Sequence, residues 1–395
     1  MIFTDWRFFI FFAITLAVYW LLPGKTVRKL WLLLCSAVFY AFWDWRFLFL
    51  IVLVIANSYV TGLAVSAADT PPLRKRILTV GIVLSLSVLG FFKYFNFFLL
   101  SAEQLLSRLH VLVPHSTLQV LLPVGISFYT FHSLSYMVDV YRRRVQATWS
   151  LIDIGLYILF FPQLVAGPIL RATSFLPQLG VAKQFAAVDW RGALVLFLVG
   201  FFKKACVADN LSPLVDAVFA NPPAYGAADA LVATLSYTVQ IYCDFSGYTD
   251  MAIAAAAMLG YHLPANFAHP YLAANLADFW RRWHISLSSW LRDYLYIPLG
   301  GNRYGTVATV RNLMLTMLLG GLWHGAAWTF VFWGALHGIG LVVHRAFASV
   351  AGIGSRPPER MFSALPILVT FCWVSFAWIF FRAATFHDAV GMLAA

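Results

Sequence analysis

The fold is decided by residues 307–343, which read VATVRNLMLTMLLGGLWHGAAWTFVFWGALHGIGLVV and contain a single arginine as their only formal charge. A membrane crossing needs only about 20 helical residues, so this apolar stretch is too long for one span. Gly320, Gly321 and Gly325 lie near its middle, and we expect the chain to turn or break there. His324 lies at that break, and an ionisable side chain inside such a segment is a candidate for a functional site.

The whole chain has the composition of a polytopic membrane protein. Its 395 residues are 62% hydrophobic and 11% charged, whereas a soluble domain is typically about 25% charged. The mean hydropathy is +0.79. The apolar runs are too continuous for barrel strands, which alternate apolar and polar residues in segments of about ten. The net charge of +11 falls in short basic clusters between apolar runs, which indicates topology signals rather than nucleic-acid binding.

These runs predict an all-α polytopic membrane protein with about eleven transmembrane helices in one integral domain, residues 1–395. The expected spans are residues 8–22, 30–42, 47–67, 77–92, 120–140, 152–169, 190–202, 231–259, 307–319, 326–343 and 362–381. The run 152–169 contains Pro162, Gly167 and Pro168, which predicts a broken or re-entrant segment that lines a cavity. The run 231–259 is long for one span and contains two aspartates, so we expect a kink or a part outside the bilayer.

Basic residues predict the topology. Three clusters follow the first, third and fifth spans: Lys25, Arg28 and Lys29; Arg74, Lys75 and Arg76; and Arg142, Arg143 and Arg144. The positive-inside rule places all three in the cytoplasm and the N-terminus outside. The N-terminus lacks the basic region and the small-residue cleavage site of a signal peptide, so we expect the first span to be a retained helix.

The densest polar cluster is residues 278–293, DFWRRWHISLSSWLRD. As one helix it would be amphipathic, with an apolar face and a polar face. The apolar face would hold Trp280, Trp283, Leu287, Trp290 and Leu291, and the polar face Arg281, Ser288 and Arg292. One interpretation is an interfacial helix at headgroup depth. The other is the wall of a polar funnel, in which Arg281 or Arg282 attracts an anionic donor and His284 faces the reaction path.

The histidines leave two interpretations open. His324 is either a core residue hydrogen-bonded to a carbonyl or a general base, because burial favours the neutral imidazole that can accept a proton. His337 and His344 are seven residues apart and match no zinc motif, so helix packing is the better interpretation for both. The four cysteines show no CxxC spacing, and we expect neither a metal site nor a disulfide framework.

Asp244, Tyr248 and Asp250 lie together in DFSGYTD, residues 244–250. An aspartate at lipid depth normally has a partner, and the favoured interpretation is a structural ion pair with an arginine such as Arg281 or Arg282. The alternative is a proton relay or a group that orients a histidine. The chain has no G-x-S-x-G elbow, Walker A or dinucleotide motif, which argues against a hydrolase-type serine and against nucleotide chemistry.

Five motifs together resemble the membrane-bound O-acyltransferase (MBOAT) family. They are LPVGISFYTF at 122–131, VAGPI at 165–169, DFSGYTD at 244–250, FWRRWHISLS at 279–288 and WHG at 323–325. They occur in family order within a motif-rich core of about residues 121–345. Within the family, the sequences of these motifs are most similar to those of the bacterial alginate O-acetylation proteins. The D-alanyl transfer proteins of teichoic acid form a related branch.

The resemblance implies a ring of transmembrane helices around a thin core, with funnels on both sides of the membrane. It implies that His324 matches the catalytic histidine of the family and that His284 matches its second histidine. The expected substrate-binding residues are Arg281, Arg282, Trp283, Ser288, Trp323, Asp244 and Tyr248. Neither a metal nor a bound cofactor is implied.

The resemblance also implies a pathway in the bacterial inner membrane. An acetyl group would be taken from a cytoplasmic donor, acetyl-CoA, and passed across the membrane. A periplasmic acetyltransferase partner would then place it on hydroxyls of an exopolysaccharide such as alginate. The alternatives are D-alanyl transfer to teichoic acid, a transporter of an acyl or lipid carrier without chemistry, and a scaffold for a periplasmic enzyme. Alginate-type members continue beyond the position of Ala395, so a shorter subtype or a truncated chain is expected.

Overall fold

The computed structural model describes residues 1–111, 120–350 and 364–395, and within these ranges the chain is helical and has no β-strand. The chain separates into two compact units. Unit 1 comprises Met1–Phe197 and Met251–Pro264, and unit 2 comprises Leu198–Asp250 and Ala265–Ala395. The predicted all-α class is confirmed, and the prediction of a single integral domain stays a prediction.

The chain passes between the units within α10 (Trp190–Phe201), within α12 (Ala227–Met258) and again after Pro264. The other helices of unit 1 are α1 (Trp6–Leu21), α2 (Lys25–Asp44), α3 (Leu48–Ala67), α4 (Pro71–Leu89), α5 (Phe95–Arg108), α6 (Ile126–Tyr141), α7 (Leu151–Leu159), α8 (Phe161–Leu164) and α9 (Ala172–Gly180). Those of unit 2 are α11 (Asp209–Ala220), α13 (Leu276–Arg282), α14 (Ile285–Leu291), α15 (Gly305–His324), α16 (Trp328–Val350), α17 (Ala364–Arg382) and α18 (Phe386–Ala394). Short 3-10 and π-helical segments join several of them.

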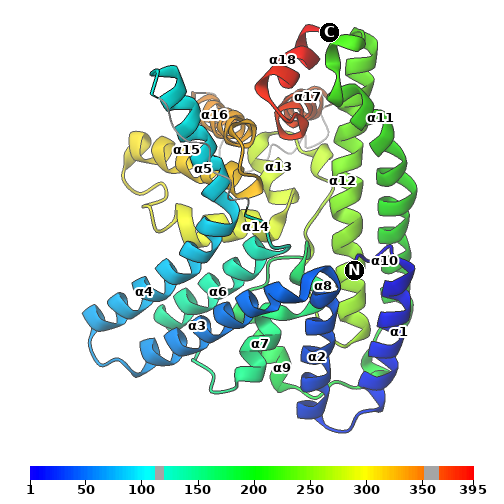
Figure 1. Cartoon of the computed structure of the whole chain (residues 1–395), viewed down its shortest axis with the longest axis vertical. Coiled ribbons are helices and arrows are strands. Elements are labelled where there is room, and N and C mark those ends of the chain that lie inside the picture. Colours follow the sequence, from blue (N-terminus) through cyan, green and yellow to red (C-terminus); the bar gives the residue numbers. More distant parts are fainter. Residues whose placement is uncertain (112–119, 351–363) are drawn as a thin grey trace. The chain divides into compact units, whose positions relative to one another are not determined.

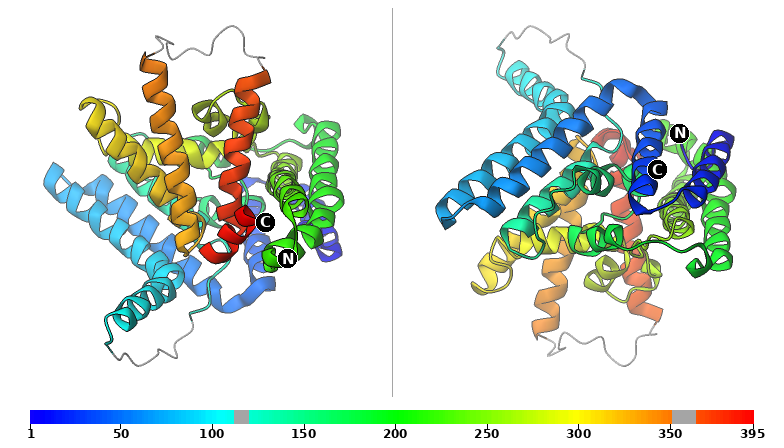
Figure 2. Two further views of the ribbon diagram at one scale, coloured as in Figure 1. Left: turned by 90° about the horizontal axis from the view of Figure 1, so that it is seen from above. Right: turned by 90° about the horizontal axis from the view of Figure 1, so that it is seen from below.

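Helices α3, α4 and α6 of unit 1 pack against one another, and α3 and α4 lie side by side in Figures 1 and 2. Small hydroxyl and amide side chains join the three helices. Ser58 of α3 lies 2.7 Å from Ser133 of α6, and Ser85 of α4 lies 3.1 Å from the same hydroxyl. Asn57 donates to Ser85 at 2.9 Å. Such bonds join membrane helices because the surrounding lipid offers no alternative partner.

In unit 2, α15 and α16 form a close helical hairpin. A Cβ atom added at Gly321 would overlap the carbonyl oxygen of Phe330, and one added at Gly334 would overlap the carbonyl of Met317. Only glycine therefore permits the two backbones to approach this closely. The predicted break is confirmed, because α15 ends at His324 and α16 begins four residues later.

The broken segment expected in residues 152–169 is also confirmed. Helix α7 ends at Leu159, α8 covers only Phe161–Leu164, and no helix follows until α9. By contrast, α12 runs for 32 residues without interruption. At about 1.5 Å per residue it is much longer than a hydrocarbon core of about 30 Å, so part of it must extend beyond that core if it spans a membrane.

The prediction of one amphipathic helix over residues 278–293 is wrong. The chain forms two short helices, α13 and α14, that are separated at Trp283 and His284. His284 has φ 43° and ψ 54°, in the left-handed region, where an α-helix cannot continue. The apolar residues on the two sides of this break therefore do not form one continuous helical face.

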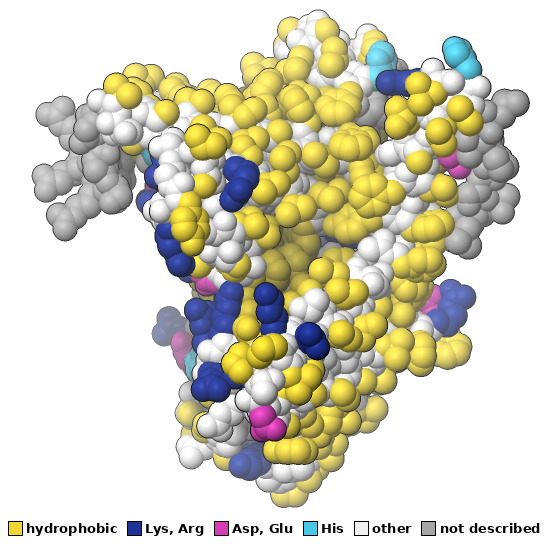
Figure 3. Space-filling model, turned by 90° about the vertical axis from the view of Figure 1, so that its left-hand side faces the viewer, with side chains coloured by type: hydrophobic (Ala, Val, Ile, Leu, Met, Phe, Trp, Pro, Cys, Tyr) yellow, Lys and Arg dark blue, Asp and Glu magenta, His cyan; other side chains and the backbone are white. Residues whose placement is uncertain are grey.

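Five segments within the described ranges are long and apolar enough to cross a membrane: Lys25–Ala67, Pro71–Arg108, Gly305–His324, Trp328–Val350 and Ala364–Arg382. Helix α1 is a shorter apolar helix. Several of the eleven expected spans are shorter in the structure, since α6 has 16 residues and α10 has 12. Figure 3 shows hydrophobic side chains over most of one face, with Lys and Arg gathered in groups. Such extensive apolar exposure is typical of a surface in contact with lipid.

Candidate active site

His324 is the last residue of α15, and aromatic rings surround its imidazole. Its ring centroid lies 4.9 Å from that of Trp323, 5.1 Å from that of Trp333 and 5.2 Å from that of Phe381. The following residue, Gly325, is extended and ends the helix. The side chain is only partly buried, so the imidazole is enclosed but can still be reached.

His284 lies at the break between α13 and α14 and is 1% exposed. The edge of its ring meets Phe245 of α12, with centroids 4.6 Å apart, and Trp323 lies 5.9 Å away. Neither ring nitrogen has a hydrogen-bond partner among the described residues. Burial, reinforced by the neighbouring His324, holds the pKa of His284 well below its usual range. This favours the neutral imidazole, which has one donor nitrogen and one acceptor nitrogen.

The two histidines are neighbours, with ring centroids 6.3 Å apart. They come from segments about 40 residues apart in the sequence, and Trp323 contacts both of them. A positive charge on one imidazole disfavours a positive charge on the other. At most one of the two rings is therefore protonated at a time. Such a pair can take up a single proton and pass it on.

Asn266 holds the chain in place beside His284. Its carbonyl accepts the N–H of Ile285 at 2.9 Å. Its side-chain oxygen accepts both the N–H and the hydroxyl of Ser286, at 3.1 and 2.9 Å. His284 provides no side-chain cap for α14, so Asn266 takes the place of an N-cap residue and accepts from donors at the start of the helix.

Replacing Asn266 with alanine should destabilise unit 2. The substitution removes the side-chain oxygen that accepts two buried hydrogen bonds from Ser286, and loss of a partner in a buried site costs about 1–3 kcal/mol. We expect a clear drop in the thermal unfolding temperature of the detergent-solubilised protein. The matched control is alanine at Asn302, which is exposed and should leave the temperature unchanged. Equal unfolding temperatures for the two variants would contradict this role of Asn266.

The expected substrate-binding residues do not all lie at the histidine pair. Trp323 does, since it contacts both imidazoles. Ser288 lies one turn into α14 and its hydroxyl donates to the carbonyl of Trp283 at 3.1 Å. Trp283 is a core residue, packed against Phe267 and Trp378 with centroids 5.0 Å from each.

The two arginines occupy the last turn of α13. Arg282 pairs with Asp278, one turn earlier, at 2.9 Å. Arg281 is exposed. Neither arginine forms the ion pair that the sequence suggested for Asp244.

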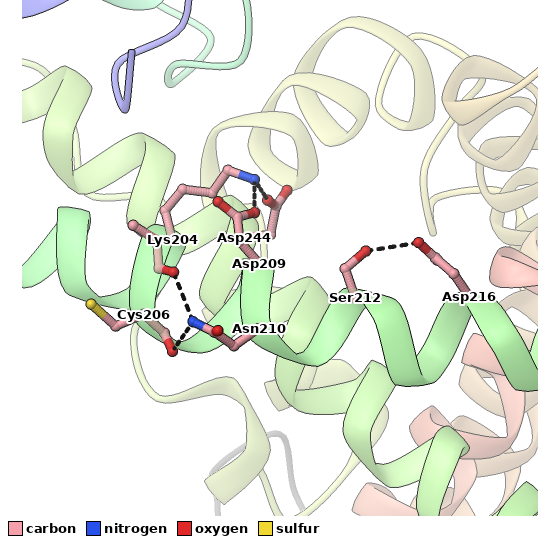
Figure 4. A network of polar contacts seen from close by, with 8 residues as sticks. Lys204, Cys206, Asp209, Asn210, Ser212, Asp216 and Asp244 are labelled. Carbon is pink, nitrogen blue, oxygen red and sulfur yellow. Dashed lines mark hydrogen bonds and ion pairs between the residues drawn. The ribbon is translucent and has the colours of Figure 1, made fainter. Parts of the chain in front are cut away.

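Asp244 pairs instead with Lys204, as Figure 4 shows. The lysine nitrogen lies 2.6 Å from Asp244 and 2.6 Å from Asp209, and the Asp244 side chain is half exposed. The adjacent Lys203 pairs with Asp250 at 2.7 Å. These contacts tie the π-helical segment between α10 and α11 to α12 and support a structural role for both aspartates. Tyr248, one turn beyond Asp244, is buried.

Sequence reasoning missed three apolar neighbours of the pair, Phe245, Trp333 and Phe381. Aromatic residues are so frequent in this chain that no pattern distinguished these three. The sequence indicated a packing role for His337. That histidine is fully buried between the rings of Trp280 and Trp333, with centroids 5.2 and 4.8 Å away, an arrangement that fits packing. No group of three or more His, Cys, Asp or Glu side chains that could hold a metal ion occurs in the described parts of the chain.

Comparison with known proteins gives consistent similarities. The model of the membrane-bound O-acyltransferase family, MBOAT, matches residues 73–383. A protein of Azotobacter vinelandii named "probable alginate O-acetylase AlgI" is 44% identical over 98% of this chain and 76% of its own length. A peptidoglycan O-acetyltransferase of Helicobacter pylori is 39% identical over 92% of this chain and 73% of its own length. A teichoic acid D-alanyltransferase of Bacillus subtilis is 28% identical over 69% of this chain and 71% of its own length.

Proposed function

The chain belongs to the membrane-bound O-acyltransferase family, and we propose that it takes an acetyl group from a cytoplasmic donor and passes it across the membrane for O-acetylation of an extracytoplasmic polysaccharide, with His324 as the general base. It is a multi-pass membrane enzyme that transfers acyl groups to oxygen. The observation that carries the more specific proposal is the pair of neighbouring imidazoles, His324 and His284, inside a largely apolar aromatic enclosure.

The reaction needs one proton to be removed and returned. A neutral His324 takes the proton from the attacking hydroxyl as its oxygen forms a bond to the acyl carbon. The carbon–sulfur bond of the thioester donor then breaks. His324 gives its proton to the leaving thiolate, which departs as the thiol. A positioned base of this kind typically accelerates a reaction by about 10²–10⁴-fold. The half-buried position of His324 at the end of α15 leaves its ring accessible to both reactants.

His284 has a complementary role in this proposal. Its neutral imidazole carries one N–H group, and no described residue accepts that hydrogen. We assign this donor to the acyl carbonyl oxygen, which becomes negatively charged in the tetrahedral transition state. A fixed donor in a dry site stabilises such a charge far better than water does. The low exposure of His284 and the bonds from Asn266 that fix the start of α14 support this assignment.

The orientation in the membrane is part of the proposal. Two of the basic clusters lie in the first turns of α2 and α4, and the third follows α6, where Arg144 lines the same pocket as Asp153. Arg74 donates to the carbonyl of Tyr141 at 3.1 Å, and Lys29 pairs with Asp153 at the start of α7 at 2.6 Å. Such proximity supports one shared face for the clusters, which the positive-inside rule assigns to the cytoplasm. The N-terminus would then be outside an inner membrane, with acetyl-CoA as the cytoplasmic donor.

The acceptor is proposed from the relatives. Two of them are named for O-acetylation, of alginate and of peptidoglycan, and both are similar to this chain over more than nine tenths of its length. We assign a polysaccharide hydroxyl as the final acceptor, reached through a periplasmic acetyltransferase partner. Peptidoglycan is the second candidate acceptor, because the 39% identical relative carries that name.

The test is a gene deletion in the host bacterium, with ester groups measured on purified exopolysaccharide, peptidoglycan and teichoic acid by NMR. Loss of acetyl esters from exopolysaccharide, restored by the intact gene, is the expected result. Loss from peptidoglycan alone would move the proposal to the second acceptor. Loss of D-alanyl esters, or no change in any ester, would overturn acetylation as the function. Proteoliposomes with labelled acetyl-CoA separate transfer from transport, because transport would move the label without forming an ester.

A further inference from the structure

Unit 1 contains a basic pocket far in sequence from the histidine pair. Its volume is about 210 Å³. Four cationic side chains line it, from the start of α2 and from the segment after α9: Lys25, Arg28, Lys29 and Lys183. No acidic side chain is among the residues that line the pocket. Grouping four positive charges in so small a space is unfavourable unless an anion offsets them.

Most of this charge has no carboxylate partner among the described residues. Lys29 alone pairs with an acid, Asp153. Arg28 donates to three backbone carbonyls, of Leu22 and Lys183 at 2.9 Å and of Trp20 at 3.3 Å. These bonds fix the guanidinium in place but leave its charge uncompensated. A fixed and uncompensated guanidinium is well suited to bind a phosphate group.

The other two cations of the pocket, Lys25 and Lys183, also lack a carboxylate partner among the described residues. Lys25 donates to the carbonyl of Gly180 at 3.3 Å. Lys183 lies over the ring of Tyr261, 4.7 Å from its centroid. Burial lowers the pKa of Lys183 below its ordinary value, so an anion beside it would favour its charged form. Arg28 holds the backbone carbonyl of Lys183 in place, and both lysines have donor capacity left for a ligand.

The backbone at the pocket adds donors of its own. Gly24 is the N-cap of α2 with φ +69°, and no side chain caps the helix there. A side chain at this position would require strained backbone. The first amides of a 20-residue helix therefore remain available next to the lysines, and a helix start of this kind favours anions.

We infer that this pocket binds a phosphate group, carried either by an anionic lipid headgroup or by a soluble phosphorylated molecule. The size supports a single charged group, since sites for whole drug-sized ligands are about 300–1,000 Å³. The charge pattern supports phosphate over a carboxylate, because several cations and amides surround one small volume. The inference is independent of the proposed acyl transfer, since none of its residues belongs to the histidine site.

The test removes the charges of Lys25 and Lys183 and keeps the residues that support the fold. In the double variant Lys25→Gln/Lys183→Gln, Arg28 keeps its backbone carbonyls and Lys29 keeps Asp153. The matched control is Lys75→Gln/Arg76→Gln, which removes two exposed charges from the start of α4. Thermal unfolding in phosphate-free buffer confirms that each variant is folded. If the double variant does not fold, Lys25→Gln and Lys183→Gln are measured singly.

Two arms distinguish the sources of phosphate. In the first, native mass spectrometry of protein in mixed phosphatidylglycerol and phosphatidylcholine nanodiscs measures retained lipid. In the second, calorimetry in neutral detergent measures binding of coenzyme A and of inorganic phosphate. We expect at least one phosphate-bearing probe to bind the double variant about tenfold more weakly than the wild type and the control. Retention of phosphatidylglycerol that the double variant loses assigns the pocket to lipid, and saturable binding of coenzyme A or inorganic phosphate that the double variant loses assigns it to a soluble molecule. Equal binding of every probe to all three proteins would overturn the inference.

Discussion

Replacing His324 with alanine is expected to abolish acyl transfer and to leave the protein folded in the membrane. The side chain is only partly buried at the end of α15, so its loss removes few packing contacts. A general base of the kind that we propose for His324 typically contributes about 10²–10⁴-fold to the rate, so we expect a loss of roughly a thousandfold. The measurement is ester formation by purified protein with labelled acetyl-CoA, together with acetyl content of polymer from cells that carry the variant.

Two further variants make this result specific. His324→Gln keeps a hydrogen-bonding side chain of similar size but cannot accept a proton, and it should be as inactive as the alanine variant. His387→Ala removes an exposed histidine of α18 and should retain full activity. All three proteins should elute as single species in gel filtration. Normal acetylation by either His324 variant would contradict the assignment of the base.

Replacing Gly321 with alanine is expected to disrupt the hairpin of α15 and α16. The added methyl group would overlap the carbonyl oxygen of Phe330, and backbone cannot move aside as the end of a side chain can. Overpacking of this kind costs about 1–3 kcal/mol, and we expect the upper end of that range. The measurement is the yield of monodisperse protein in detergent and its thermal unfolding temperature, both of which should fall sharply.

The control for this variant is alanine at Gly90, where an added Cβ meets no atom within 4 Å and the backbone is helical. Alanine there should be neutral or slightly stabilising, because it lowers the entropy lost by glycine on folding. Unlike the His324 variants, Gly321→Ala should lose activity and stability together, since Trp333 of α16 packs against the imidazole. If Gly321→Ala unfolds at the wild-type temperature, the close packing of α15 against α16 does not require glycine at this position, and the prediction is contradicted.

The break at His324 could be predicted because it follows from length alone. An apolar run of 37 residues that includes glycines cannot remain one membrane helix of ordinary length. The break at Phe160 was predictable for a related reason, since proline and glycine interrupt the run there. The pairing of His324 with His284 was not predictable from periodicity and came from the family resemblance.

The interruption at His284 was missed because no local signal marks it. Neither glycine nor proline occurs between Asp278 and Asp293, and the spacing of apolar residues fits a helix on both sides. The left-handed turn is fixed by bonds to Asn266, 18 residues earlier, and such distant partners are invisible to a local pattern. The partner of Asp244 was missed for the same reason. Lys204 is 40 residues away, and only the fold brings a π-helical segment against α12.

The left-handed backbone at His284 has a consequence for engineering. An L-residue other than glycine in that conformation costs about 1–2 kcal/mol, so glycine at position 284 would suit the local backbone better than histidine does. Glycine would also remove a buried imidazole that packs against Phe245 and Trp323, and the cavity left by a large buried side chain costs about 2–5 kcal/mol. A thermostabilisation campaign on this enzyme should hold position 284 constant, because relief of the backbone there is outweighed by the cavity and would also remove the donor that we propose for the acyl oxygen.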